Sequence, residues 1–343
     1  MTFANGLGCR LDLDAPGKRL GHLDLTHSDN VHAFDVIPAP IAVIAQGAGP
    51  TILLTAGNHG DEYEGQVILR RLWAETAAER VSGRIVLMPA LNYPAMLADR
   101  RISPLDDGNL NRSFPGRADG GPTAAIADFV VRRLLPMAQA AIDFHSGGRQ
   151  TEFVPSTFLC THADATITRR SLELAEVFAA PYIYAIRGAD SPAGMDPHAH
   201  DAGVAMFSTE LSGGGGVNVK ATDIGYRGLR RVLHHLGILE WRDDAPAPGA
   251  SRLLDGVDGA TTVMSPITGI FEPFHELGAQ VQAGAPAGRV WALEEIDRPP
   301  EILPFQGDGV VAVRRAPARV VRGSFVYVVT PELSREALLR LRA

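Results

Sequence analysis

Cysteine is scarce in this chain of 343 residues, which contains only Cys9 and Cys160. Two thiols cannot form the disulfide framework of a small secreted protein, and they fit a chain that folds in a reducing cytoplasm. No apolar run approaches the roughly 18 residues of a membrane span. Residues 1–18 also lack the apolar core of a secretory signal. We therefore expect a cytoplasmic protein.

An excess of positive charge is also missing. Lys and Arg number 32 against 39 for Asp and Glu, which gives a formal net charge of −7. A mildly acidic chain is a poor candidate for binding nucleic acid, which normally needs a basic face. The 45% hydrophobic and 21% charged residues are an ordinary globular mixture, so the chain is neither disordered nor fibrous. Its length corresponds to about two domains at roughly 150 residues each.

Buried-type strands alternate with amphipathic helices in the first part of the chain. Residues 51–56 and 84–90 are continuous apolar runs, typical of strands covered on both faces. Between them, Ile68, Leu69, Leu72 and Trp73 are spaced to form one helical stripe. Strand, helix, strand is the unit of a parallel sheet. Further strands are predicted near 36, 41–44, 141–144, 157–160 and 203–209, and further helices near 126–134, 167–179 and 226–236.

These elements predict an α/β domain over residues 1–242, with a mostly parallel sheet and helices on both faces. We expect the strands near residues 36 and 41–44 to be short, because Pro38 and Pro40 interrupt them.

A change of composition follows this region. Asp243–Gly249 (DDAPAPG) has the Pro, Ala and Asp content of a linker. Beyond it, valines alternate with turn residues, with no strong helical pattern before about Glu332, which predicts a smaller all-β domain over 250–343. SPITGIFEPF, GAQVQAG and GAPAGRV resemble the hairpins of biotinyl/lipoyl-like folds. Those carriers present a lysine at a hairpin tip, and Lys220 is the last lysine here, so we expect no carrier role.

Two histidines and a glutamate follow buried strands. His59 and Glu62 lie three residues apart where the strand 51–56 meets a helix, and His145 ends the strand 141–144. The carboxyl ends of parallel strands meet in one crevice. A His₂Glu set there would hold zinc and leave a fourth position for water. Alternatively, His59 caps the helix, Glu62 is a first-turn acid favoured by the helix dipole, and His145 is a core histidine.

Three further features have a chemical interpretation. Glu210 closes the strand near 203–209 and is placed to take a proton from an activated water, although a solvated acid would fit as well. Asn111 and Arg112 lie in a long polar loop, 92–122, and together suit a carboxylate. His198 and His200, in MDPHAHDAG, are interpreted as part of a solvated or gating loop rather than as metal ligands.

GNHGDEYEG, GNLNRSFPG, DFHSGG and TEL, in this order, resemble the succinylglutamate desuccinylase/aspartoacylase family, which shares the zinc-carboxypeptidase fold. The resemblance covers nearly the whole chain. It is strongest to the branch that deacetylates N-α-acetyl-L-2,4-diaminobutyrate in ectoine degradation.

The resemblance also implies the roles of individual residues. His59, Glu62 and His145 would bind one zinc ion, and Glu210 would be the general base and acid. Asn111 and Arg112 would hold the substrate carboxylate. Arg101 would polarise the scissile carbonyl, with Arg100 as its neighbouring competitor for that role.

The expected function is therefore zinc-dependent hydrolysis of the amide bond of an N-acyl amino acid. Aspartoacylase-type, succinylglutamate desuccinylase-type and carboxypeptidase activities are the alternatives among enzymes. A non-catalytic zinc-containing binding protein is the alternative of another class, but structural zinc sites usually have four ligands, often Cys. The expected partner is a small N-acyl amino acid, with no nucleic acid and no membrane. The sequence leaves the oligomeric state open, a homo-oligomer included.

Overall fold

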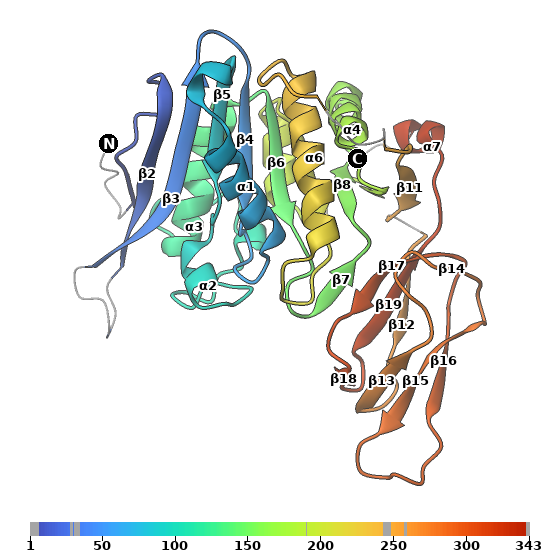
Figure 1. The fold of residues 1–343 in the computed structure, drawn as a ribbon. Coiled ribbons are helices and arrows are strands. Elements are labelled where there is room, and N and C mark those ends of the chain that lie inside the picture. Colours follow the sequence, from blue (N-terminus) through green and yellow to red (C-terminus); the bar gives the residue numbers. More distant parts are fainter. Residues whose placement is uncertain are drawn as a thin grey trace.

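The computed structural model describes residues 7–27, 30, 35–189, 191–242, 248–256 and 259–340. Within them the chain forms a large helix-covered sheet, and two smaller antiparallel sheets project below it (Figure 1). The predicted fold class, α/β with a smaller β-rich part, is confirmed. Among the described residues, no helix combines the length and apolar character that a membrane span requires.

The large sheet has ten strands in the order β1-β2-β3-β5-β4-β6-β10-β8-β9-β11. Its central strands β5, β4, β6 and β10 run parallel to one another, and β8, β9 and β11 run antiparallel to them. The strands are β1 (Leu7–Cys9), β2 (Gly17–His27), β3 (Asp35–Gln46), β4 (Thr51–Ala56), β5 (Gly83–Met88), β6 (Ala140–His145), β8 (Ser156–Cys160), β9 (Tyr182–Ile186), β10 (Ala205–Glu210) and β11 (Arg252–Asp255).

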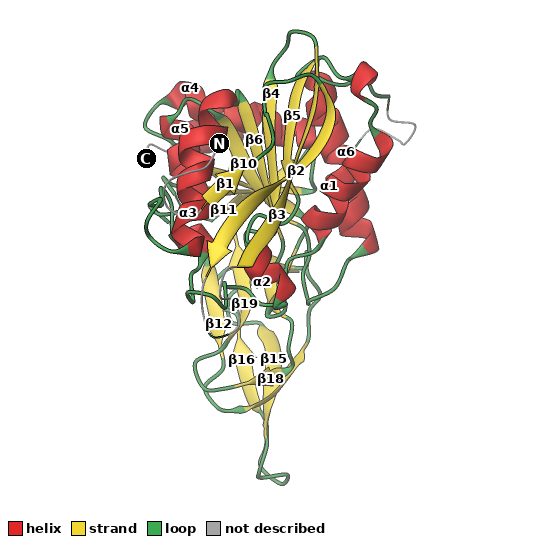
Figure 2. Ribbon diagram, turned by 90° about the vertical axis from the view of Figure 1, so that its left-hand side faces the viewer, coloured by secondary structure: helices red, strands yellow, loops and turns green. Residues whose placement is uncertain are grey.

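Helices cover both faces of this sheet (Figure 2). α1 (Glu64–Glu75), α4 (Ala165–Phe178) and α6 (Val219–His235) share one buried core with Ile52 and Ile142 of the central strands. α3 (Pro122–Phe129) and α5 (Met195–Asp201) share the other with Leu53 and Ala141. Alternate residues of each central strand therefore enter different cores, which explains their continuous apolar runs. The short helix α2 (Tyr93–Leu97) follows β5.

Strand β3 corrects one sequence prediction. Instead of short strands interrupted by Pro38 and Pro40, a single strand of 12 residues pairs with β2 from Asp35 to Ala45. Its pairing with β5 begins only at Ala42. Both prolines therefore lie where one edge of β3 has no neighbouring strand, and a residue without an N–H is tolerated at such an edge.

The C-terminal part consists of two antiparallel sheets around a core that includes Phe271, Val290 and Tyr327. One sheet contains β12 (Thr261–Met264), β19 (Phe325–Thr330), β17 (Gly309–Arg315) and β14 (Gln280–Val281), and β7 (Thr151–Phe153) pairs with β17. The other contains β16 (Glu301–Pro304), β15 (Pro286–Ala292), β13 (Gly269–Pro273) and β18 (Arg319–Val320).

Elements cross the predicted domain border in both directions. β11 joins the large sheet through β9, and α7 (Arg335–Arg340) buries Leu338 in the core of α1, α4 and α6. β7 of the α/β part joins the C-terminal sheet instead. Of the predicted linker, residues 243–247 lie outside the described residues. The division into residues 1–242 and 250–343 stays a prediction.

Candidate active site

His59 lies in a glycine-rich turn between β4 and α1. Gly57 has a φ of +68°, which favours glycine. A Cβ on Gly60 would stand 2.1 Å from the carbonyl carbon of Ala95, so only glycine lets this turn pass so close to α2. The turn buries His59 and Glu62, which are only 2% and 3% exposed. Glu62 lies two residues before α1 begins.

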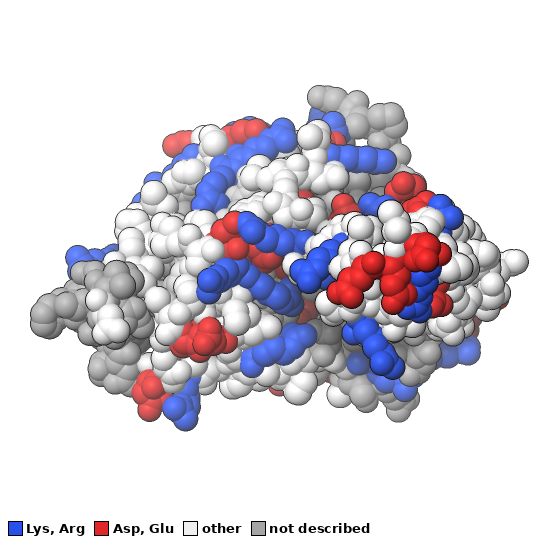
Figure 3. Space-filling model, turned by 90° about the horizontal axis from the view of Figure 1, so that it is seen from below, with Lys and Arg blue, Asp and Glu red and all other residues white. Residues whose placement is uncertain are grey.

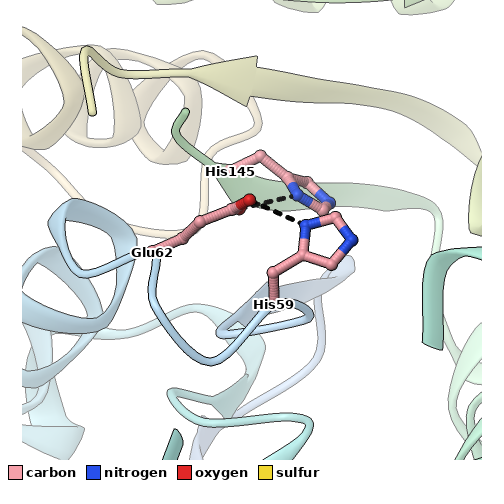
Figure 4. A group of neighbouring side chains, drawn as sticks. All are labelled: His59, Glu62 and His145. Atoms are coloured by element: carbon pink, nitrogen blue, oxygen red, sulfur yellow. Dashed lines mark hydrogen bonds and ion pairs between the residues drawn. The ribbon is translucent and has the colours of Figure 1, made fainter. Parts of the chain in front are cut away.

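His145 reaches the same point from the end of the neighbouring strand β6. Its Nδ1 lies 2.9 Å from Oε2 of Glu62, while Nδ1 of His59 lies 2.7 Å from Oε1 (Figure 4). Each of the three residues offers one possible metal-ligand atom, and these atoms all lie within 4.8 Å of one another. Two imidazoles and a carboxylate are the ligand set of catalytic zinc centres that keep one position open. These residues therefore fit a zinc ion.

The far side of each imidazole is also bonded. Nε2 of His145 lies 2.8 Å from Oδ2 of Asp143, which in turn accepts from Asn58, and the other carboxylate oxygen accepts from Thr55. Nε2 of His59 lies 3.2 Å from Oδ1 of Asn109. Metal-binding histidines usually donate their second N–H to an oxygen in this way, which fixes the ring. Both rings thus direct Nδ1 toward Glu62.

Charged groups lie close to His145 on both sides. Burial alone would raise the pKa of Glu62, but the neighbouring His59 and His145 prevail and lower it well below its usual range. Burial alone would lower the pKa of His145, but Asp143 and Glu62 prevail and raise it well above its usual value. Two carboxylates therefore lie on opposite sides of one buried imidazole.

Glu210 ends β10 directly beside His145. The two residues are paired in the parallel register of β10 and β6, so their side chains leave the sheet on the same face. Both border a cavity of about 380 Å³. Seen from below, basic and acidic side chains gather together around the middle of the surface (Figure 3). Of the predicted site residues, this cavity is lined by His59, Arg101, Asn111, Arg112, His145 and Glu210.

Arg101 and Arg112 enter the cavity from the long loop. Nη1 of Arg101 lies 3.4 Å from Oε1 of Glu62, and Arg100 is not among the lining residues. Of Arg100 and Arg101, it is therefore Arg101 that lies near the buried side chain of Glu62. Arg112 is exposed and donates from Nη1 to the carbonyl of Asn111 at 2.8 Å. Asn109 fixes this turn by accepting from the backbone N–H of Asn111 at 3.2 Å.

Several residues at or beside the cavity lay outside the sequence prediction. Asp143 does not line the cavity but holds His145, and it could have been found, since it stands two residues earlier on the same strand and so on the same face. The apolar wall of Phe153, Phe158 and Ile186 comes from β7, β8 and β9, where no motif marks it. Asp196 of α5 adds an acid to the cavity.

The interpretation of His198 and His200 as a solvated or gating loop was wrong. Both belong to α5, whose Met195 and Ala199 enter the second core. His200 is buried, and its Nε2 lies 3.3 Å from the carbonyl of Met206. Within the described ranges, His59, Glu62 and His145 are the one group of three or more potential ligands placed to hold a metal.

Comparison with known proteins gave matches over most of the chain. Residues 48–236 match the family described as succinylglutamate desuccinylase/aspartoacylase catalytic domain. The chain is 39% identical over 326 residues to N-alpha-acetyl-L-2,4-diaminobutyric acid deacetylase of Halomonas elongata, covering 94% of each protein.

Solved structures gave similar results. The product-bound ectoine utilization protein EutE (DoeB) from Ruegeria pomeroyi has a TM-score of 0.89 at 40% identity, covering 96% of this chain and 100% of that one. A succinylglutamate desuccinylase from Silicibacter sp. TM1040 has a TM-score of 0.91 at 38% identity, covering 97% and 100%. These similarities therefore extend over the C-terminal sheets as well as the α/β part.

Proposed function

The chain belongs to the succinylglutamate desuccinylase/aspartoacylase family, and from this we propose that it is a zinc-dependent hydrolase of N-acyl amino acids. We propose N-α-acetyl-L-2,4-diaminobutyrate as its substrate, in a step of ectoine degradation. The relatives at 39% and 40% identity bear names that support this choice. The observation that carries the chemistry is the buried group of His59, Glu62 and His145 beside a cavity that Glu210 also lines.

Nδ1 of His59, Nδ1 of His145 and a carboxylate oxygen of Glu62 would hold the metal. Three protein ligands leave room for water or a substrate oxygen. Zinc in such a centre polarises a carbonyl and lowers the pKa of bound water toward ~7. Asp143 and Asn109 contact Nε2 of the two imidazoles and so keep Nδ1 of each ring turned toward the ion.

Glu210 is the proposed proton carrier. It takes a proton from the attacking water as the amide carbonyl becomes tetrahedral. It then returns this proton to the nitrogen of the leaving amino acid, so that acetate and the free amino acid are the products. Arg101, beside Glu62, would stabilise the negative charge that develops on the carbonyl oxygen.

Asn111 and Arg112 would hold the α-carboxylate, because a guanidinium binds a carboxylate through two parallel hydrogen bonds. Oδ1 of Asn111 and Oδ2 of Asp196 lie 3.7 and 3.8 Å from the point where a Cβ on Gly194 would stand. Asp196 therefore lies close to Asn111, and we propose that it faces the side chain of the bound substrate. Diaminobutyrate carries an ammonium group there, whereas aspartate and glutamate carry a carboxylate that Asp196 would repel.

A turnover panel tests this proposal. The zinc-loaded enzyme is assayed on N-α-acetyl-L-2,4-diaminobutyrate, N-acetyl-L-aspartate, N-succinyl-L-glutamate, N-α-acetyl-L-2-aminobutyrate and short peptides. We expect the highest kcat/KM for the first compound and a lower value for the 2-aminobutyrate derivative, which lacks the ammonium group.

Other outcomes identify the alternatives. Faster turnover of the aspartate or glutamate compound would indicate an aspartoacylase- or desuccinylase-type enzyme. Faster cleavage of peptides would indicate a carboxypeptidase. No turnover of any compound would favour a binding protein and contradict the proposal.

A further inference from the structure

Strand β7 connects the catalytic cavity to the C-terminal sheet. It leaves the α/β part after β6 and pairs antiparallel with β17, with Glu152 opposite Arg314 and Phe153 opposite Val313. Thr151 and Phe153 of this strand line the cavity. One wall of the cavity is therefore a strand whose neighbour belongs to the C-terminal sheet.

The segment that precedes β7 reaches the buried histidines. The backbone N–H of Ser146 donates to Oε2 of Glu62 at 3.2 Å. The N–H groups of Gly147 and Phe153 both donate to the carbonyl of Ser212, at 3.0 and 3.1 Å. Residues 146–153 are therefore one short segment that contacts Glu62 at its start and lines the cavity along its length.

An ion pair fixes β7 to β17. Nη2 and Nε of Arg314 donate to Oε2 of Glu152 at 2.7 and 3.1 Å. The two side chains are only 21% and 27% exposed, so solvent screens this pair less than an ordinary surface pair. Nη1 of Arg314 donates to Glu276 at 3.1 Å, but that acid is 90% exposed and lies on the C-terminal part itself.

The wall separates two cavities only in part. Phe153, Phe158 and Ile186 line both the catalytic cavity and a second cavity of about 670 Å³. Met264 and Phe325 of the C-terminal sheet also line this second cavity. The wall therefore borders open space in both cavities, and the pairing with β17 and the ion pair hold it together with the hydrogen bond from Phe153 to Ser212.

From these contacts we infer that Arg314 is a positioning residue for catalysis: through Glu152 it holds β7 where the substrate binds. The C-terminal sheet thereby contributes to substrate binding without contributing a group to the chemistry. This inference goes beyond the proposed function, although its kinetic test rests on the proposed substrate.

Kinetics of Arg314→Gln, Glu152→Gln and the double variant test this inference. We expect each to raise KM for N-α-acetyl-L-2,4-diaminobutyrate about tenfold and to keep kcat within about twofold, with zinc content unchanged. The double variant should be no worse than either single variant, because both remove one interaction. Arg314→Lys should recover part of the loss.

Two matched controls remove comparable ion pairs elsewhere. Glu276→Gln removes the other partner of Arg314 and leaves the contact with β7 intact. Arg289→Gln breaks the pair with Glu272, which joins β13 and β15 through two hydrogen bonds of 2.7 and 2.9 Å. Both controls should keep the wild-type KM. An equal rise of KM in Arg289→Gln would overturn the inference, as would an unchanged KM in folded Arg314→Gln.

Hydrogen exchange gives a readout that needs no substrate. Amides of residues 146–153 should exchange faster in Arg314→Gln than in wild type, and the exchange of β4 and β6 should be unchanged. Unchanged exchange in 146–153 would contradict the inference. Failure of the proposed function is a separate result, because it appears as absent turnover by the wild-type enzyme.

Discussion

Glu210 lies beside His145 on the neighbouring strand, and its carboxylate is proposed to carry the proton in both halves of the reaction. Glu210→Gln keeps the shape of the side chain and removes its basicity. We expect kcat to fall about 10²–10⁴-fold, the usual contribution of general acid–base catalysis. Zinc content and melting temperature should stay at the wild-type values. A kcat within a few-fold of wild type would mean that another group carries the proton.

Arg112 is exposed and borders the cavity beside Asn111, where it is proposed to bind the α-carboxylate. Hydrogen bonds to a charged group contribute about 1.5–3 kcal/mol. Arg112→Ala should therefore lower kcat/KM for N-α-acetyl-L-2,4-diaminobutyrate about 10- to 100-fold and leave the zinc content intact.

The control for Arg112 is the substrate in which a neutral amide replaces the α-carboxylate. Wild type should process it poorly, and Arg112→Ala should lose little more. An equal loss on both substrates would instead assign Arg112 to the fold or to the developing oxyanion. Arg112→Lys should recover only part of the activity, because lysine lacks the planar guanidinium.

His200 makes stability depend on pH. Burial lowers its pKa from 6.5 to about 4, with the charge of His162 adding to the effect and the carbonyl of Met206 and Asp201 opposing it. The unfolded chain binds this proton near pH 6.5, whereas the folded chain binds it only near pH 4. Protonation therefore favours unfolding, and the free energy of unfolding falls as the pH is lowered through this window.

Denaturant unfolding at pH 7 and pH 4 checks the role of His200. His200→Gln should show a smaller loss of unfolding free energy than wild type between these values, by at most about 3 kcal/mol. His22→Gln, at an exposed position on β2, serves as the control and should behave like wild type. An equal loss in His200→Gln and wild type would rule out this histidine as the source.

At the scale of elements, the contact of α1 with the sheet sets the distance between Glu62 and His145. Gly65, in the first turn of α1, faces β6 so closely that a Cβ there would stand 2.2 Å from Cβ of Phe144. Gly65→Ala should move α1 away from β6. We expect it to lower the free energy of unfolding by about 1–3 kcal/mol, despite the higher helix propensity of alanine.

The same variant should bind zinc more weakly, because Glu62 precedes α1 and His145 follows Phe144. Competition with a chelator measures this affinity. Gly249→Ala is the matched control, since a Cβ there meets no atom within 4 Å. Normal stability and normal zinc affinity in Gly65→Ala would mean that the helix adjusts without displacing Glu62.

The sequence predicts those helices and strands whose pattern of apolar residues lies within the element itself. β4, α1 and β5 were predicted because each carries its own pattern: two apolar runs and one helical stripe. The length of β3 was not, because the effect of a proline depends on whether a strand lies beside it. Helix α5 was missed because its polar sequence hides the two residues, Met195 and Ala199, that enter the core.

At the scale of the whole molecule, the predicted ligands and cavity residues come together because each follows a strand or lies in a loop at one edge of the sheet. This rule predicts which edge of the sheet carries the site, but it does not predict which residues face one another there. No sequence pattern indicates that Thr151–Phe153 would pair with a strand more than 150 residues later, or that Asp196 would face the cavity. Such long-range pairings depend on how whole elements pack.

The central claim is that zinc bound by His59, Glu62 and His145 hydrolyses an N-acyl amino acid. Its most direct test is a titration of the metal-free enzyme with zinc, followed by the release of acetate from N-α-acetyl-L-2,4-diaminobutyrate. The account predicts that activity rises linearly, breaks at one zinc per chain, and stays at baseline in His145→Ala. Full activity before zinc is added, or a His145→Ala titration that matches wild type, would contradict it.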